Sequence, residues 1–165
     1  MERPTHFAPV ADARVRVLIL GSLPGAESLR RAEYYAHPAN AFWRLAGALA
    51  GRDLVALPYS ERLAALLAAH IGLWDVIARA DRRGSLDAAI RDPEHADLAA
   101  LVATLPDLRA IGFNGKTAAK AGRKLLETRP GGPLLIDLPS SSPAYAAMPF
   151  EGKLERWSVL KDHLV

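Results

Sequence analysis

The chain has 165 residues, a formal net charge of +3 and a pI near 9.4, and half of its residues are hydrophobic. These values predict one soluble domain, residues 1–165, with a sizeable core, and the mild basic excess is compatible with a polyanionic partner. Because there is no cysteine, disulfides, iron–sulfur clusters and Cys-based zinc sites are excluded. The five histidines are scattered without metal-binding spacing, so no metal or organic cofactor is expected.

The beginning of the chain lacks the basic and then apolar pattern of a signal peptide. No apolar run reaches the roughly 18 residues that a membrane-spanning helix needs. We therefore expect a cytoplasmic protein that has no membrane partner and acts as a monomer.

Buried-strand patterns and helical patterns alternate along the sequence. Leucine-rich and β-branched runs predict strands at residues 15–21, 108–114 and 133–140, and residues 72–77 fit a short strand or an extended turn. Apolar residues at helical spacing predict a short helix within 21–33 and further helices at 41–51, 60–70, 85–90, 94–105, 115–127 and 151–164. Asn40 and Ser60 are expected to cap the helices that follow them.

This alternation predicts an α/β fold, a three-layer α/β/α sandwich with a short, mainly parallel central sheet. In such folds, ligands bind beyond the carboxyl ends of the strands. Three loops leave those ends: GSLPG at 21–25, FNGK at 113–116 and LPSSSPAY at 138–145. All are rich in Gly, Ser, Pro or Asn, which form turns and let a ligand approach the backbone closely. We expect the functional site where these loops meet.

Two common catalytic loops are absent from these positions. A phosphate-binding P-loop ending in the Gly-Lys-Thr of FNGKT would need a glycine at position 110, which is Ala110. A hydrolase elbow, G-x-S-x-G, would need its serine at the third position, whereas GSLPG has Ser22 at the second. The amides at the start of the helix after FNG, together with Lys116, still suit a single DNA phosphate.

The stretch YYAHPANAFW, residues 34–43, holds four aromatic residues in a chain that is only 7% aromatic. Judged alone, Phe42 and Trp43 fit a helix packed on the core, and His37 fits a structural hydrogen-bonding role. An amide such as that of Asn40 beside an exposed ring would also suit a stacked base. The loop 138–145 likewise fits either a rigid surface turn or a stiff loop whose hydroxyls and amides bind phosphates.

Together, GSLPGAESL, YYAHPANAFW, GLWDVI and LPSSSPAY resemble the uracil-DNA glycosylase superfamily over nearly the whole chain. The mismatch-specific branch has G-I-N-P-G followed by H-P-x-N-x-F-W. This chain keeps the second motif and has GSLPG in place of the first, which is similar to the hypoxanthine-DNA glycosylase (DNA-deoxyinosine glycosylase) family. The resemblance implies a base excision repair enzyme that flips a deaminated base out of double- or single-stranded DNA. It would hydrolyse the N-glycosidic bond and leave an abasic site, with hypoxanthine as the base and uracil or xanthine as further candidates.

The chain departs from these relatives at three positions. Ser22 stands where the mismatch-specific enzymes have a catalytic Asn, and Leu138 stands where the best-known uracil enzymes have a His. Tyr145 replaces the Asn of an S-P-A-N motif. The resemblance therefore implies that Asn40 is the catalytic residue, orienting the attacking water or holding the ring. Help for the leaving base would then come from loop amides, Ser22 or His37.

The resemblance also implies the other site residues. Phe42 would be the surface on which the flipped base stacks. The remaining base-binding residues would be Gly21, Ser22, Leu23, Pro24, Gly25 and His37. DNA contacts would come from Ser140, Ser141, Ser142, Pro143, Tyr145 and Lys116.

Two other functions stay open from the sequence. One is a uracil or mismatched-thymine glycosylase, because a pocket that takes hypoxanthine also suits pyrimidines. The other is a nucleic-acid-binding α/β module without catalysis, since two of the usual catalytic positions are changed.

Overall fold

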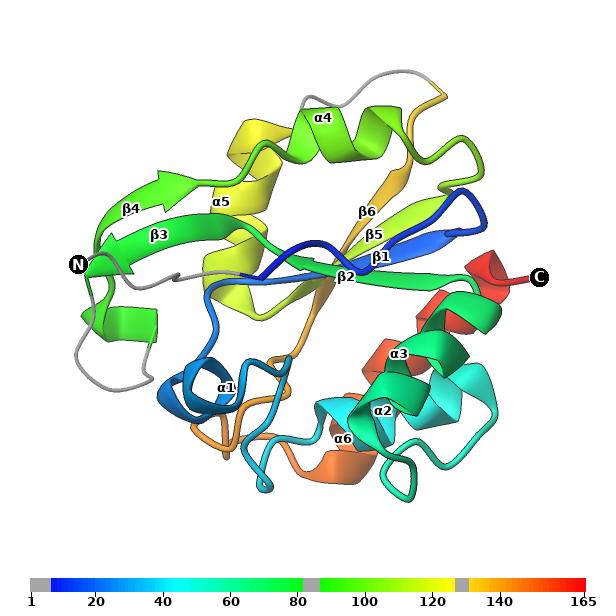
Figure 1. The fold of residues 1–165 in the computed structure, drawn as a ribbon, viewed down its shortest axis with the longest axis horizontal. Coiled ribbons are helices and arrows are strands. Elements are labelled where there is room, and N and C mark those ends of the chain that lie inside the picture. Colours follow the sequence, from blue (N-terminus) through cyan, green and yellow to red (C-terminus); the bar gives the residue numbers. More distant parts are fainter. Residues whose placement is uncertain (1–6, 82–86, 127–130) are drawn as a thin grey trace.

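The computed structural model describes residues 7–81, 87–126 and 131–165. At its centre is a four-stranded parallel sheet in the order β2-β1-β5-β6 (Figure 1). The strands are β1 (Val17–Gly21), β2 (Ile71–Asp75), β5 (Ala110–Asn114) and β6 (Leu134–Leu138). Gly21 is paired with Asp75, and Asn114 with Leu138, so the carboxyl ends of all four strands lie at one edge of the sheet.

Helices cover both faces of this sheet. Figure 1 shows α2 (Phe42–Ala50), α3 (Tyr59–Ala68) and α6 (Phe150–Trp157) together on one side, with α4 (Leu98–Ala103) and α5 (Lys116–Leu125) on the other. The short helix α1 (Ala26–Arg31) follows the loop after β1. The expected three-layer α/β/α arrangement is confirmed.

The two faces of the sheet have separate cores because successive residues of a strand point to opposite sides. In β1, Val17 and Ile19 pack into one core, whereas Leu18 and Leu20 pack into the other. All four side chains are fully buried. A strand buried on both faces has a continuous apolar run rather than an alternating one, which is why residues 15–21 were recognisable from sequence.

One region departs from the expected helices. Residues 94–105 were expected to form one helix, but β4 (Arg91–His95) pairs antiparallel with β3 (Ile77–Asp81), and α4 begins only at Leu98. The Asp97 side chain accepts a hydrogen bond from the Ala100 N–H at 3.1 Å, and this cap fixes the helix start. The helix expected at 85–90 lies partly outside the described residues. The described part contains the 3-10 turn η1 (Asp87–Ala89).

The boundaries of two further helices differ from the expectation. Ser60 does not cap α3, because the helix already includes Tyr59 and Pro58 occupies the cap position. The final helix α6 ends at Trp157 and continues as the 3-10 helix η2 (Ser158–His163). In the part of the chain that the structure describes, no helix is both long and apolar enough to cross a membrane.

Candidate active site

A cavity of about 500 Å³ opens at the carboxyl-terminal edge of the sheet. This volume lies within the range of small-molecule binding sites. The three loops expected to meet there contribute to its wall: residues 21–25, Asn114 and residues 140–145. The segment that joins α1 to α2 supplies the remaining side. A site at the carboxyl end of parallel strands is the position that this type of fold favours.

The loop after β1 supplies one wall, and Gly21 is required there. A Cβ atom on Gly21 would lie 2.7 Å from the Asp75 carboxylate and 2.7 Å from the Tyr35 hydroxyl. The loop is fixed by the chain that follows β2. The Val76 N–H donates to the Gly21 carbonyl at 2.8 Å, and the Ile77 N–H donates to the Ser22 carbonyl at 2.9 Å.

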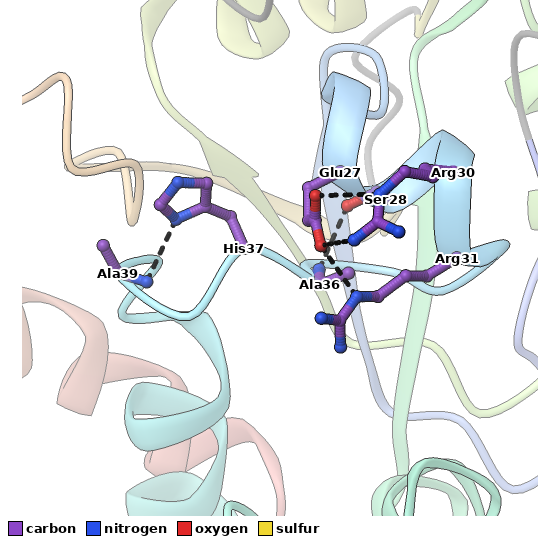
Figure 2. A network of polar contacts seen from close by, with 7 residues as sticks. All are labelled: Glu27, Ser28, Arg30, Arg31, Ala36, His37 and Ala39. Atoms are coloured by element: carbon purple, nitrogen blue, oxygen red, sulfur yellow. Dashed lines mark hydrogen bonds and ion pairs between the residues drawn. The ribbon is translucent and has the colours of Figure 1, made fainter.

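A polar network holds the segment between α1 and His37 (Figure 2). The Ser28 hydroxyl accepts the Ala36 N–H at 3.0 Å. Glu27, which also lines the cavity, is paired with Arg30 and Arg31, and hydrogen bonding from Arg30 first of all lowers the pKa of its carboxyl. The contact between Ser28 and Ala36 attaches the segment before His37 to α1, whereas the ion pairs of Glu27 lie within α1.

The His37 ring is exposed at the cavity wall and is held by the turn that follows it. Its Nδ1 accepts the Ala39 N–H at 3.0 Å, as Figure 2 shows. A backbone N–H is always a donor, so Nδ1 has no proton in this arrangement and Nε2 carries it in the neutral ring. His37 therefore offers an N–H donor from Nε2.

Asn40 lines the cavity and begins α2. Its Oδ1 accepts the Phe42 N–H at 2.9 Å, so Asn40 caps the helix from one residue before the assigned cap, Ala41. The Ala41 N–H donates to the Ser141 carbonyl at 2.9 Å and ties this segment to the loop 138–145, called the serine loop below. With Oδ1 engaged by the helix, the Nδ2 amide is the part of Asn40 that remains for a ligand.

Phe42 lies elsewhere than expected. It is fully buried in the core, and the Tyr35 ring is stacked on it with centroids 3.9 Å apart and planes inclined by 18°. Tyr35 lines the cavity, whereas Phe42 is not among its lining residues. Tyr34 and Tyr145 also line the cavity, and of the three tyrosines Tyr35 is the one stacked on Phe42. Its backbone φ of 52° is unusual for a bulky residue.

Asn114 joins Tyr35 to the serine loop. Its Nδ2 donates to the Ser141 hydroxyl at 2.9 Å and to the Tyr35 hydroxyl at 3.3 Å, and its Oδ1 accepts the Ser141 N–H at 2.9 Å. Ser141 is only 1% exposed. Its N–H and its hydroxyl oxygen take part in this internal contact, and Ser141 also lines the cavity. The expected contact between Ser141 and a DNA phosphate stays a prediction.

The rest of the serine loop surrounds the cavity mouth. Ser140, Ser142, Pro143 and Tyr145 all line the cavity, and the Ser140 hydroxyl accepts the Ser142 N–H at 3.1 Å. Lys153 donates to the Ser142 carbonyl at 3.2 Å, and burial lowers the pKa of its amine. Lys116 is exposed at the first residue of α5 and is not among the residues that line the cavity.

Besides Glu27, two carboxylates that the sequence did not single out line the cavity. Asp75 ends β2, is 4% exposed and lies against Gly21. Asp87 begins η1, and the Ser22 hydroxyl donates to its Oδ1 at 2.7 Å. Burial, followed by the charge of Asp75, raises the pKa of the Tyr35 hydroxyl. No Lys or Arg is among the described residues that line the cavity.

A signal for some of these residues was present in the sequence. Asp75 and Asn114 are polar residues at the carboxyl ends of buried strands, the position where ligands meet a parallel sheet. Asp87 gave no such signal, because its approach to Ser22 depends on the hairpin of β3 and β4. Leu138 is buried and its side chain packs beside Gly112. The position where the best-known uracil enzymes have a His therefore holds a packing residue in this chain.

Comparison with known proteins gives concordant results. The family model of the uracil DNA glycosylase superfamily matches residues 8–161. A hypoxanthine DNA glycosylase from Methanosarcina barkeri is 45% identical over 114 residues, which cover 69% of this chain and 72% of that protein. Its counterpart from Methanosarcina acetivorans is 44% identical over the same shares. The solution NMR structure of a candidate uracil DNA glycosylase from Methanosarcina acetivorans has a TM-score of 0.84 and 39% identity, with 98% of each chain covered.

Proposed function

We propose that this chain, which belongs to the uracil DNA glycosylase superfamily and is a DNA glycosylase, removes hypoxanthine from DNA. The observation that carries the choice of base is the 45% identity to a hypoxanthine DNA glycosylase. The cavity at the sheet edge supports it, since its size suits a flipped base. The partner is double- or single-stranded DNA inside the cell. The protein binds this DNA as a monomer.

The first step is extrusion of the damaged nucleotide. Flipping costs a few kcal/mol and is easiest where pairing is already weak, as it is for a deaminated base. The flipped ring enters the cavity and stacks on Tyr35, and such a stack is worth about 1–3 kcal/mol. Phe42 supports Tyr35 from behind. The loop 21–25 encloses the edge of the ring.

The second step is hydrolysis of the N-glycosidic bond. Positive charge develops on the sugar as the bond breaks, as it does in other glycosidic cleavages. Asn40 positions the attacking water or the base through its Nδ2 amide, because its Oδ1 is engaged by Phe42. His37 donates a hydrogen bond from Nε2–H to the departing base and stabilises the negative charge that develops on it.

DNA outside the cavity is held by its phosphates. The cavity mouth presents Ser140, Ser142, Pro143 and Tyr145, and Lys116 adds a cation at the start of α5. Contacts of this kind position the duplex without reading its sequence, and they weaken as salt concentration rises.

The test uses duplex oligonucleotides with a single deoxyinosine opposite T or C. After incubation with the protein, alkali cleaves the strand wherever an abasic site was formed. We expect cleavage at the inosine and none in the matched undamaged duplex. Absence of cleavage at inosine would refute the proposed base preference.

Uracil is the second candidate base. The superfamily name and the name of the structurally similar Methanosarcina acetivorans protein both refer to uracil. The same assay on deoxyuridine duplexes separates the two bases. A higher single-turnover rate on uracil than on hypoxanthine would make uracil the principal substrate.

A further inference from the structure

The loop after β1 places the Ser22 hydroxyl at the cavity wall. A hydroxyl is a poor base by itself and requires an adjacent acceptor to become effective. Ser22 has one, because its Oγ donates to Asp87 Oδ1 at 2.7 Å across 65 positions of sequence. Both residues line the cavity, and Ser22 is 8% exposed.

Three other polar groups of the cavity already have partners in the structure. Asn40 Oδ1 accepts the Phe42 N–H, and His37 Nδ1 accepts the Ala39 N–H. Glu27 is paired with two arginines on α1. Attack by water on the sugar releases a proton, and none of these three groups is well placed to take it.

The cavity also suits a cationic transition state. Its described lining contains carboxylates but no Lys or Arg. A carboxylate directed at developing positive charge stabilises it more strongly in an enclosed site than in water. Asp75 lies deep against Gly21, whereas Asp87 is only partly buried and reaches the cavity beside the loop after β1.

We propose that Asp87, through the Ser22 hydroxyl, accepts the proton of the attacking water during excision. The inference rests on the proposed function. The water oxygen forms a bond to C1′ while the bond between C1′ and the base nitrogen breaks, and its electron pair leaves with the base. The water proton passes to Ser22 Oγ as the Ser22 proton passes to Asp87 Oδ1. The departed base takes up a proton from solvent.

The primary test compares single-turnover excision of deoxyinosine by the wild type, Asp87→Asn, Ser22→Ala and the double variant. Asp137→Asn is the matched control, since this exposed carboxylate on β6 pairs with Arg123 of α5 and is not among the residues that line the cavity. We expect Asp87→Asn to lower the rate by about 100-fold or more, as is typical for loss of a general base. Ser22→Ala is expected to add little to the loss caused by Asp87→Asn, because both changes interrupt one relay.

Two further measurements separate chemistry from folding. Binding to a duplex with a tetrahydrofuran abasic-site analogue, followed by fluorescence anisotropy, should be similar for the wild type and Asp87→Asn. Formate added to Asp87→Gly should restore part of the lost rate, because a small carboxylate can occupy the space of the missing one. A merely structural Asp87 would not be rescued by formate.

The outcomes are distinguishable. If the wild type excises hypoxanthine and Asp87→Asn does so at a similar rate, the relay is wrong while the proposed function stands. Loss of rate together with an equal loss of abasic-DNA binding and no formate rescue would also overturn the relay. If the wild type excises no deaminated base, the proposed function itself fails.

Discussion

The helix contact of Asn40 and its proposed role toward the substrate can be separated by a pair of substitutions. Its Oδ1 accepts the Phe42 N–H at the start of α2, and its Nδ2 amide is assigned to the substrate. Asn40→Asp keeps an oxygen for the helix and removes the amide donor. Asn40→Ala removes both. The two variants should therefore differ in stability but agree in activity.

The stability difference follows from one cap. Replacing a capping Asn by Ala costs about 1 kcal/mol, which lowers the melting temperature by about 2–4 °C in a domain of this size. Asn40→Asp should remain close to the wild type, since its charge is favourable near a helix N-terminus. Thermal unfolding followed by circular dichroism measures both shifts.

The activity loss should be the same for both variants. Removing one preorganised donor from an active site costs about 100- to 1,000-fold in rate. Single-turnover excision of deoxyinosine measures this loss, and binding to abasic-analogue DNA controls for folding. Wild-type activity in Asn40→Asp would refute the reasoning, because it would show that the amide donor is dispensable.

Three further predictions concern the proposed stacking of the base on Tyr35, the packing of α5 and stability at alkaline pH. Tyr35→Leu should weaken binding of deoxyinosine DNA by about 5- to 150-fold, the equivalent of one base–aromatic stack, and unchanged affinity would contradict the assignment. Gly122→Ala should lower the melting temperature by about 2–8 °C, because the added Cβ would overlap the buried Phe113 ring. The cost of this overlap exceeds the gain in helix propensity from alanine. An unchanged melting temperature would show that the ring moves freely. Burial raises the pKa of Tyr34, Tyr35 and Tyr59 above the unfolded value, so the stability they confer is complete below about pH 10 and is lost above it. Urea unfolding from pH 8 to 11.5 should show that loss, and the part of the tyrosine absorbance near 295 nm that comes from these three of the four tyrosines should rise together with unfolding rather than before it.

Much of the fold was predictable because parallel strands buried on both faces have continuous apolar runs. Residues 15–21 and 108–114 contain β1 and β5, the two central strands. The hairpin of β3 and β4 was missed because Arg91–His95 contains charged residues and a proline, and no apolar alternation marks it as a strand. The predicted positions of helix starts were also imprecise, since α4 was expected from residue 94 and begins at Leu98.

The position of the cavity was predictable from the loop after β1 and from the motif that precedes α2. Residues 21–25, His37 and Asn40 all reach the cavity, as expected. Phe42 was misplaced because sequence cannot tell which of two nearby aromatics faces a cavity. Here Tyr35 adopts a left-handed backbone conformation and covers Phe42. The contact between Ser22 and Asp87 joins distant segments and has no local signal.

The most direct measurement of the central claim is the release of the free base. A deoxyinosine duplex is incubated with the wild type, and the products are separated by chromatography and identified by mass. The account predicts equal amounts of free hypoxanthine and of an intact strand that carries one abasic site. Recovery of the duplex with its inosine in place, or cleavage of the phosphodiester strand without release of hypoxanthine, would contradict it.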